Sequence, residues 1–189
     1  MSKIVSVFER KEIKREGKTK KNYSTILFGY NRIGFGILKA LKKIGKSYLI
    51  VDFSPDIISD LKKLRVPCLY GDVYDSEFLN ELSLDKIELA VSTIPDFETN
   101  VLLIKAIRAV NPKTIIIARA HQIKDALELY KKGASYVLTP HFLGGEYVSK
   151  MVAHLKTNEK GYEEEKTRHV KMLIERLKKG HEHPEVEKD

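Results

Sequence analysis

Short apolar runs alternate with longer segments of helical period from residue 23 onward. The runs are rich in Ile, Val and Leu and are nearly uninterrupted by polar side chains. Such continuous runs are typical of parallel strands that helices cover on both faces. The runs predict six strands, at Thr25–Phe28, Ser47–Val51, Pro67–Tyr70, Leu89–Thr93, Thr114–Ala118 and Tyr136–Thr139.

Segments with apolar residues at helical spacing follow each of these runs. They predict six helices, near Ile33–Ile44, Asp56–Leu64, Ser76–Leu82, Phe97–Val110, Ile123–Lys132 and Gly145–Leu155. Two boundaries have local signals, because Ser54 and Pro55 suit a cap and first-turn proline, and Gly133 suits a helix end. Six alternating units predict an α/β fold, a Rossmann-like, doubly wound parallel sheet of six strands in the order 3-2-1-4-5-6.

The composition divides the chain into three parts. Residues 1–22 carry eight Lys or Arg against three acids, so most of the net charge of +8 lies in a basic N-terminal arm. Residues 23–156 hold the predicted strands and helices of the folded domain. Residues 157–189 begin with a charged amphipathic helix, Thr157–Lys179, and end in a tail without a periodic pattern.

Composition also excludes several classes of protein and site. No apolar run approaches the roughly 20 residues of a membrane span, and the N-terminus lacks the apolar centre of a signal peptide. The one cysteine, Cys68, excludes an internal disulfide and fits a small buried side chain in a cytosolic protein. Nucleic acid is not an expected partner, because no aromatic residues interleave with the basic ones. The trio His181-Glu182-His183 has too few ligands for a metal site.

A glycine turn joins the first predicted strand to the first predicted helix. Gly29 ends the strand, Gly34 lies in the helix, and Asp52 ends the second strand. The order strand, Gly-x-x-x-x-Gly, helix, strand, acid is typical of dinucleotide-binding domains. Gly29 allows a sharp turn and Gly34 allows the helix to lie close to the sheet, so that the N–H groups of the helix start face a pyrophosphate. Asp52 would accept hydrogen bonds from ribose hydroxyls.

This chain departs from the usual fingerprint at the middle glycine, which is Asn31. Asparagine tolerates a positive φ better than most residues, so we expect the turn to form. The Asn31 side chain nevertheless fills space that a glycine leaves open. The residues therefore leave two interpretations open, a nucleotide-binding domain and a doubly wound domain with a vacant site.

A dehydrogenase is not favoured, because the sequence shows no second domain that would supply a substrate site. His121 and His141 follow the fifth and sixth predicted strands, and His121 is the one candidate general base. We expect no catalytic residues. A small NAD-dependent oxidoreductase remains the enzyme alternative, and Asp52 disfavours NADP in it, since the 2′-phosphate would meet a like charge.

Several short motifs along the chain occur together in one family. They are Phe28-Gly29-Tyr30-Asn31-Arg32-Ile33-Gly34, Val51-Asp52, Tyr70-Gly71-Asp72-Val73-Tyr74-Asp75, Val91-Ser92-Thr93-Ile94-Pro95-Asp96-Phe97-Glu98-Thr99-Asn100, Ile117-Ala118-Arg119-Ala120 and Gly133-Ala134-Ser135-Tyr136-Val137-Leu138-Thr139-Pro140. The set resembles the RCK or KTN domain (TrkA-N-like), the nucleotide-binding regulator of potassium channels, transporters and cation/proton antiporters. The resemblance covers about residues 24–156 and is closest to the tails of prokaryotic Kef-type antiporters.

The resemblance implies a site for an adenine nucleotide, either NAD or NADH, or AMP, ADP or ATP. The glycine turn would surround the phosphates, Asp52 would hold the ribose, the turn at Asp72 would border the adenine, and the end of the fourth strand would line the middle. Asn100 and Arg119 would contact the distal half. The implied contact residues are Gly29, Tyr30, Asn31, Arg32, Ile33, Asp52, Phe53, Ser54, Gly71, Asp72, Val73, Thr93, Ile94, Asn100 and Arg119.

Two of these residues have structural alternatives. Arg119 would otherwise form a surface ion pair, and Asp72 would otherwise form an Asx turn that caps the third helix. Either alternative would remove one contact from the implied site without changing the fold.

The resemblance further implies a regulatory, non-catalytic domain that gates potassium or cation/proton transport from the cytoplasmic face of a membrane. Its partners would be a second copy, in a dimer or larger ring, and a membrane-embedded transporter or channel on the same or a separate chain. The basic arm would then be the junction to the membrane part. Candidate dimer contacts, which also suit the core, are Leu102, Leu103, Ala106 and Leu127. A dimerisation scaffold with a degenerate site is the remaining alternative.

Overall fold

The computed structural model describes residues 22–179. The basic arm up to residue 21 and the tail with His181-Glu182-His183 lie outside the described residues. The strands are β1 Thr25–Phe28, β2 Tyr48–Asp52, β3 Cys68–Tyr70, β4 Leu89–Ser92, β5 Ile115–Arg119 and β6 Tyr136–Leu138. The helices are α1 Arg32–Ile44, α2 Pro55–Lys63, α3 Ser76–Glu81, α4 Phe97–Val110, α5 Ile123–Lys131, α6 Pro140–Leu155 and α7 Glu159–Leu177, with a 3-10 turn, η1, at Leu84–Lys86.

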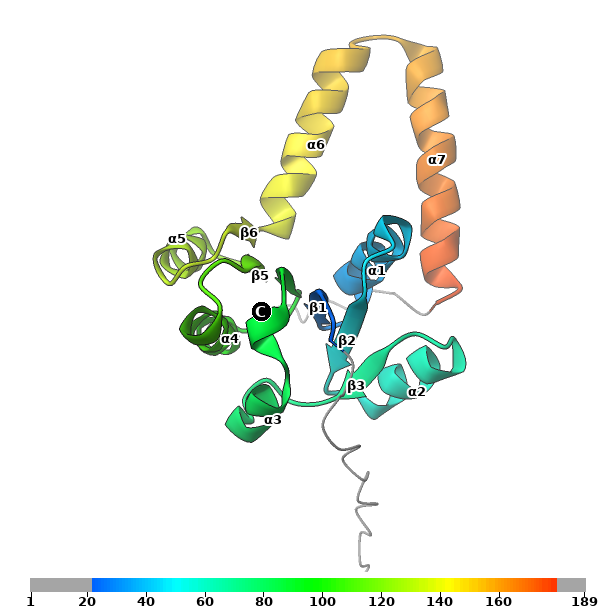
Figure 1. The fold of residues 1–189 in the computed structure, drawn as a ribbon. Coiled ribbons are helices and arrows are strands. Elements are labelled where there is room, and N and C mark those ends of the chain that lie inside the picture. Colours follow the sequence, from blue (N-terminus) through cyan, green and yellow to red (C-terminus); the bar gives the residue numbers. More distant parts are fainter. Residues whose placement is uncertain (1–21, 180–189) are drawn as a thin grey trace, which may run out of the picture.

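The six strands form one sheet in the order β3-β2-β1-β4-β5-β6, and every neighbouring pair is parallel (Figure 1). The predicted fold and strand order are therefore confirmed. The order reverses direction at β1, which lies between β2 and β4. In a sheet of this kind, ligands bind beyond the carboxyl ends of the strands at that switch point.

Helices cover both faces of the sheet, and each face has its own apolar core. Alternating residues of β1 point to opposite faces. Ile26 and Phe28 join a large cluster with residues of α3, α4 and α5, whereas Leu27 joins a smaller cluster with residues of α1 and α2. Of the candidate dimer contacts, Leu103 is 1% exposed and belongs to the core, whereas Leu102 and Leu127 are exposed.

The ends of the elements agree with the sequence patterns to within two residues, except at α6. This helix begins at Pro140, five residues before the predicted start at Gly145. Pro140 occupies the first turn, where its fixed φ suits a helix and its missing N–H costs nothing. The helix then continues through Gly144 and Gly145, although each glycine disfavours a helix by about 1 kcal/mol relative to alanine.

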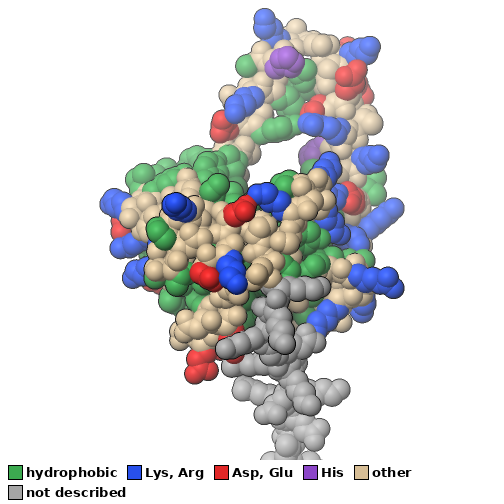
Figure 2. Space-filling model, in the orientation of Figure 1, with side chains coloured by type: hydrophobic (Ala, Val, Ile, Leu, Met, Phe, Trp, Pro, Cys, Tyr) green, Lys and Arg blue, Asp and Glu red, His purple; other side chains and the backbone are tan. Residues whose placement is uncertain are grey.

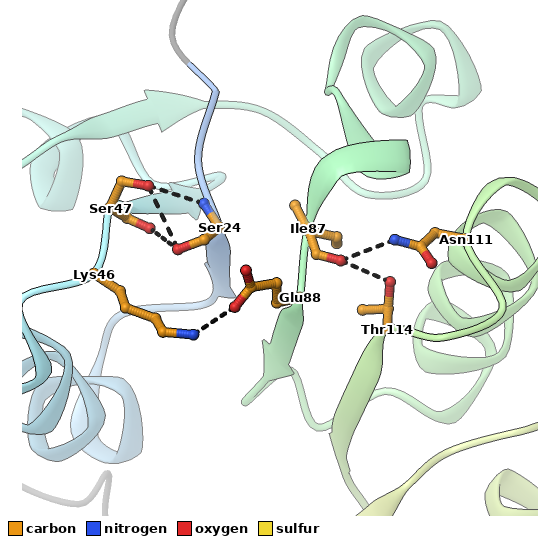
Figure 3. Close-up of polar contacts among 7 residues, drawn as sticks. All are labelled: Ser24, Lys46, Ser47, Ile87, Glu88, Asn111 and Thr114. Carbon is orange, nitrogen blue, oxygen red and sulfur yellow. Dashed lines mark hydrogen bonds and ion pairs between the residues drawn. The ribbon is translucent and has the colours of Figure 1, made fainter.

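Polar contacts join the loops at the amino edge of the sheet, opposite the switch point (Figure 3). Ser24 and Ser47 exchange hydrogen bonds, and the Lys46 ammonium pairs with Glu88. On the other side of β4, Asn111 and Thr114 both donate to the carbonyl of Ile87. These bonds fix the loops that enter β1, β2, β4 and β5.

The last two helices form a hairpin that projects from the sheet domain. α6 leads away from β6, and α7 returns to the side of α1 (Figure 1). Every residue of the two helices is at least partly exposed. Figure 2 shows an opening between the hairpin and the rest of the molecule. No helix within residues 22–179 is both long enough and apolar enough to cross a bilayer.

Candidate functional site

The turn after β1 has no room for side chains at its two glycines. Gly29 has a φ of 84°, and a Cβ there would lie 2.6 Å from the hydroxyl oxygen of Thr93. That hydroxyl donates to the carbonyl of Gly29 at 3.0 Å. A Cβ at Gly34 would lie 2.3 Å from the same carbonyl oxygen. Both glycines thus have the steric roles that the fingerprint predicts, a sharp turn and a close approach of α1 to β1.

The turn forms with Asn31 in place of the usual glycine, and it does so without a positive φ. Its φ is −40°, so the middle position of the fingerprint does not need the positive φ that we expected asparagine to tolerate. The reason is that Asn31 is the N-cap of α1, and its Oδ1 accepts from the N–H of Arg32 at 2.8 Å. The side chain thereby occupies one of the N–H groups at the helix start. Ile33 follows in the first turn and is half-buried.

The Asp52 carboxylate lies at the end of β2, directly beside this turn. It is 6% exposed. Oδ2 accepts from the N–H of Tyr30 at 2.8 Å, and Oδ1 accepts from the N–H of Ser54 at 2.9 Å. Each carboxylate oxygen keeps a further lone pair for a ribose hydroxyl. Beside it, Phe53 is exposed and Ser54 caps α2.

The turn after β3 approaches Asp52, because the N–H of Gly71 donates to the Asp52 carbonyl at 3.1 Å. A Cβ at Gly71 would lie 2.1 Å from the ring of Phe78, so packing requires this glycine. The Asp72 side chain accepts from the N–H of Tyr74 at 2.9 Å. Asp72 therefore forms the Asx turn that was its structural alternative in the sequence analysis. It does not cap α3, whose N-cap is Asp75. The Asp72 side chain is exposed, whereas that of Val73 belongs to the core.

Asn100 is fully buried and connects three segments of the carboxyl edge. Its amide nitrogen lies 2.9 Å from the carbonyl of Ile94, 2.8 Å from that of Asp96 and 3.1 Å from that of Arg119. The side chain therefore holds the end of β4 and the start of α4 against the end of β5. Its Oδ1 is buried without a hydrogen-bond partner among the described residues. A ligand contact at Asn100 remains a prediction and would have to use this oxygen.

Arg119 extends along the edge from β5 to the end of β4. Its guanidinium donates to the carbonyl of Thr93 at 3.2 Å and to Nε2 of His121 at 2.9 Å. Burial, followed by the nearby charge of Arg32, lowers the pKa of Arg119. Burial, followed by Arg119 and His141, lowers the pKa of His121. Arg32, Arg119, His121 and His141 therefore lie near one another at this edge.

The structure thus brings most of the implied contact residues to one edge. The turn after β1, the end of β2, the end of β4 and Arg119 are joined by hydrogen bonds to one another. No group of three or more His, Cys, Asp or Glu side chains suited to a metal ion occurs within residues 22–179.

The family model of the TrkA-N domain matches residues 25–140, which is more than half of the chain. This chain belongs to the TrkA-N family.

Two relatives of this TrkA-N domain are potassium-transport proteins. It is 25% identical over 144 residues to Potassium channel protein 1 of Methanocaldococcus jannaschii. The matched region covers 75% of this chain and 43% of that protein. It is 27% identical over 126 residues to the glutathione-regulated potassium-efflux system protein KefC of Cronobacter sakazakii, covering 67% of this chain and 20% of that protein. The chain therefore spans less than half the length of these relatives.

Among solved structures, the fold is similar to the Kef CTD of Shewanella denitrificans in an AMP-bound form. The TM-score is 0.59 at 19% identity, and the alignment covers 82% of this chain and 93% of that one. At this identity the likeness supports the fold of the TrkA-N domain and no more.

Two features of the candidate site were not predicted from the sequence. Tyr74 donates to the Asp96 carboxylate at 2.8 Å and so joins the turn after β3 to the start of α4. Hydrogen bonds from Thr99 and then Tyr74 lower the pKa of Asp96. The spacing of Asp96 and Thr99 before an apolar run is a capping signal that could have found half of this contact. The second feature is Arg176 of α7, whose guanidinium donates a hydrogen bond to the carbonyl of Arg32 at 2.8 Å.

Proposed function

We propose that this TrkA-N domain binds an adenine nucleotide at the carboxyl edge of its sheet and thereby regulates potassium or cation/proton transport. The observation that carries the proposal is the position of Asp52. Both of its oxygens are held by N–H groups of the adjoining turns, beside the start of α1. That arrangement fixes a buried acceptor for the ribose next to the positive end of a helix for the phosphate.

The charges at the edge support a phosphate-bearing ligand. Burial and then the charge of Arg32 lower the pKa of Arg119, and burial and then Arg119 lower the pKa of His121. A phosphate placed between these groups would relieve their mutual repulsion and accept charge-assisted hydrogen bonds. AMP is the first ligand to test, because the similar Kef CTD holds it, and ADP, ATP, NAD and NADH follow.

Regulation is the role that the relatives favour. A potassium channel protein and a KefC protein share this domain as part of a longer chain. In our proposal, residues 23–156 form the nucleotide-binding unit and residues 157–189 an appended helix and tail. The membrane-embedded partner lies on the same or a separate chain, and the domain acts at the cytoplasmic face. A nucleotide would shift transport only through its different affinity for two arrangements of the domain.

A substitution of Asp52 tests the binding site. Asp52→Ala removes the ribose acceptor and should reduce the affinity for AMP at least tenfold in isothermal titration calorimetry. Asp60→Ala is the matched control, because it removes the same charge from an exposed position on α2. We expect wild-type affinity from Asp60→Ala.

Two outcomes would contradict the proposal. Equal nucleotide binding by wild type and Asp52→Ala would place the ligand elsewhere, and no binding of any of the five nucleotides would favour a scaffold with a vacant site. Transfer of hydride from NADH to small carbonyl compounds, checked by absorbance, would revive the oxidoreductase alternative.

A further inference from the structure

Both ends of the α6–α7 hairpin contact the edge at which the nucleotide is proposed to bind. α6 begins there: the ring of His141, in its first turn, lies 6.1 Å from the ring of His121, which Arg119 contacts. α7 ends there as well, since the Arg176 guanidinium donates to the carbonyl of Arg32. The hairpin therefore begins beside His121, which Arg119 contacts, and returns to Arg32.

The contact of α7 with α1 consists of several interactions around Arg176. The guanidinium carbon lies 5.8 Å from the ring centroid of Phe35, within cation–π range. One turn of α1 away from this contact, Lys39 pairs with Glu175. On α7, Arg176 is half-buried, while its neighbour Glu175 is exposed. These interactions hold the last turn of α7 on the first two turns of α1.

The same contact continues into the turn that holds Asp52. Phe35 lies edge-to-face with Tyr30, with ring centroids 6.3 Å apart and an interplanar angle of 71°. The N–H of Tyr30 donates to the Asp52 carboxylate. A continuous set of packed and hydrogen-bonded groups thus joins the end of α7 to the ribose acceptor and to the first residue of α1.

We propose that Arg176 is a positioning residue of the phosphate subsite. It fixes the backbone at Arg32 and adds a third arginine charge near the start of α1. This inference rests on the proposed function. A bound phosphate and the docked α7 stabilise each other, because the phosphate offsets the cationic charge that α7 brings to the edge. By linkage, the factor by which docking of α7 strengthens phosphate binding equals the factor by which a bound phosphate strengthens docking of α7.

The test compares ligands that differ in phosphate charge. Arg176→Gln should weaken AMP binding roughly 3- to 10-fold and ADP binding at least as much, while adenosine binding changes less than about twofold. Arg176→Lys, which keeps the charge, should recover most of the loss. Arg168→Gln is the matched control, because Arg168 lies on the same helix about 12 Å away by helical rise and pairs with Glu165. It should bind all three ligands like wild type.

A second readout follows the hairpin itself. Hydrogen exchange of the last turn of α7, Leu173–Leu177, should slow when AMP binds to wild type and to Arg168→Gln. In Arg176→Gln it should be fast with or without AMP. Both variants should keep the circular dichroism and melting temperature of the wild type, because neither residue belongs to the core.

Specific results would overturn this inference. Unchanged AMP affinity in Arg176→Gln, or an equal loss for adenosine and AMP, would show that Arg176 does not act on the phosphate. If wild type binds AMP and this happens, only the role of Arg176 fails. If wild type binds no nucleotide, the proposed function fails together with this inference.

Discussion

Asn31 shows how a single side chain competes with a ligand for the start of a helix. A helix presents several N–H groups without partners at its first turn. In this protein the Asn31 side chain accepts one of them, the N–H of Arg32. A phosphate at the same place would need that group. The cap therefore stabilises α1 and at the same time weakens the anion site.

This competition predicts that Asn31→Gly binds AMP more tightly than wild type, because it frees the N–H of Arg32. Glycine is itself a tolerated cap, so the free energy of unfolding should fall by only a few tenths of a kcal/mol. Asn31→Ala also frees the N–H and should cost about 1 kcal/mol of stability. Calorimetry and urea unfolding measure the two effects. Weaker AMP binding by Asn31→Gly would mean that the Asn31 side chain contacts the ligand.

The residue scale also shows where sequence reasoning succeeds. The steric roles of Gly29 and Gly34 and the position of Asp52 beside the turn could be predicted, since each depends on a neighbour in the first βαβ unit or on the paired strand. The buried clamp at Asn100 could not, because its three carbonyl partners come from segments that only the tertiary fold brings together. The turn at Asn31 forms as expected, but its negative φ and its role as the N-cap of α1 were not predicted.

At the scale of elements, β5 and α6 together place His121 and His141 at the carboxyl edge. Both follow a strand end, so this position could be predicted from the order of the elements. The contact of His121 with Arg119 and the approach of the two histidine rings could not be predicted in this way. Burial, then Arg119 at the end of β5, then His141 at the start of α6 lower the pKa of His121.

The lowered pKa of His121 predicts a loss of stability on acidification. In the unfolded chain a histidine takes up a proton near its ordinary pKa of about 6.5, whereas His121 in the folded protein does so at lower pH. The unfolded state therefore binds more protons, and stability should fall as pH drops below that value until the folded pKa is passed. His121→Gln should reduce this slope in urea unfolding between about pH 7.5 and pH 5. A steeper slope in the variant would contradict the assignment.

In the molecule as a whole, the α6–α7 hairpin is the part whose apolar side chains are least covered by the rest of the chain. Large apolar side chains lie exposed along both helices. They are Phe142, Tyr147, Val148 and Val152 on α6, and Val170, Met172, Leu173, Ile174 and Leu177 on α7. Hydrophobic side chains line the opening beside the hairpin in Figure 2. Helices in water gain most of their stability from packing an apolar face, so a partner is expected here. A second copy of this chain, which the family resemblance implies as a partner, is the first occupant to test for this surface.

Light scattering should accordingly show a dimer or larger ring for the wild type. Val148→Glu together with Leu173→Glu should give a monomer with unchanged core stability, since neither side chain is buried. Lys171→Glu, together with Lys150→Glu, changes charge on the same helices outside the apolar set and should leave the assembly intact. A wild type that stays monomeric at high concentration, with and without nucleotide, would argue against self-association.

The most direct test of the nucleotide site is a crystal structure of the wild-type protein with saturating AMP. We predict density for the phosphate at the start of α1, near Arg32, and for the ribose hydroxyls within hydrogen-bond distance of the Asp52 carboxylate. A structure at comparable resolution in which Asn31 fills this place and no nucleotide density occurs at the edge would contradict the account.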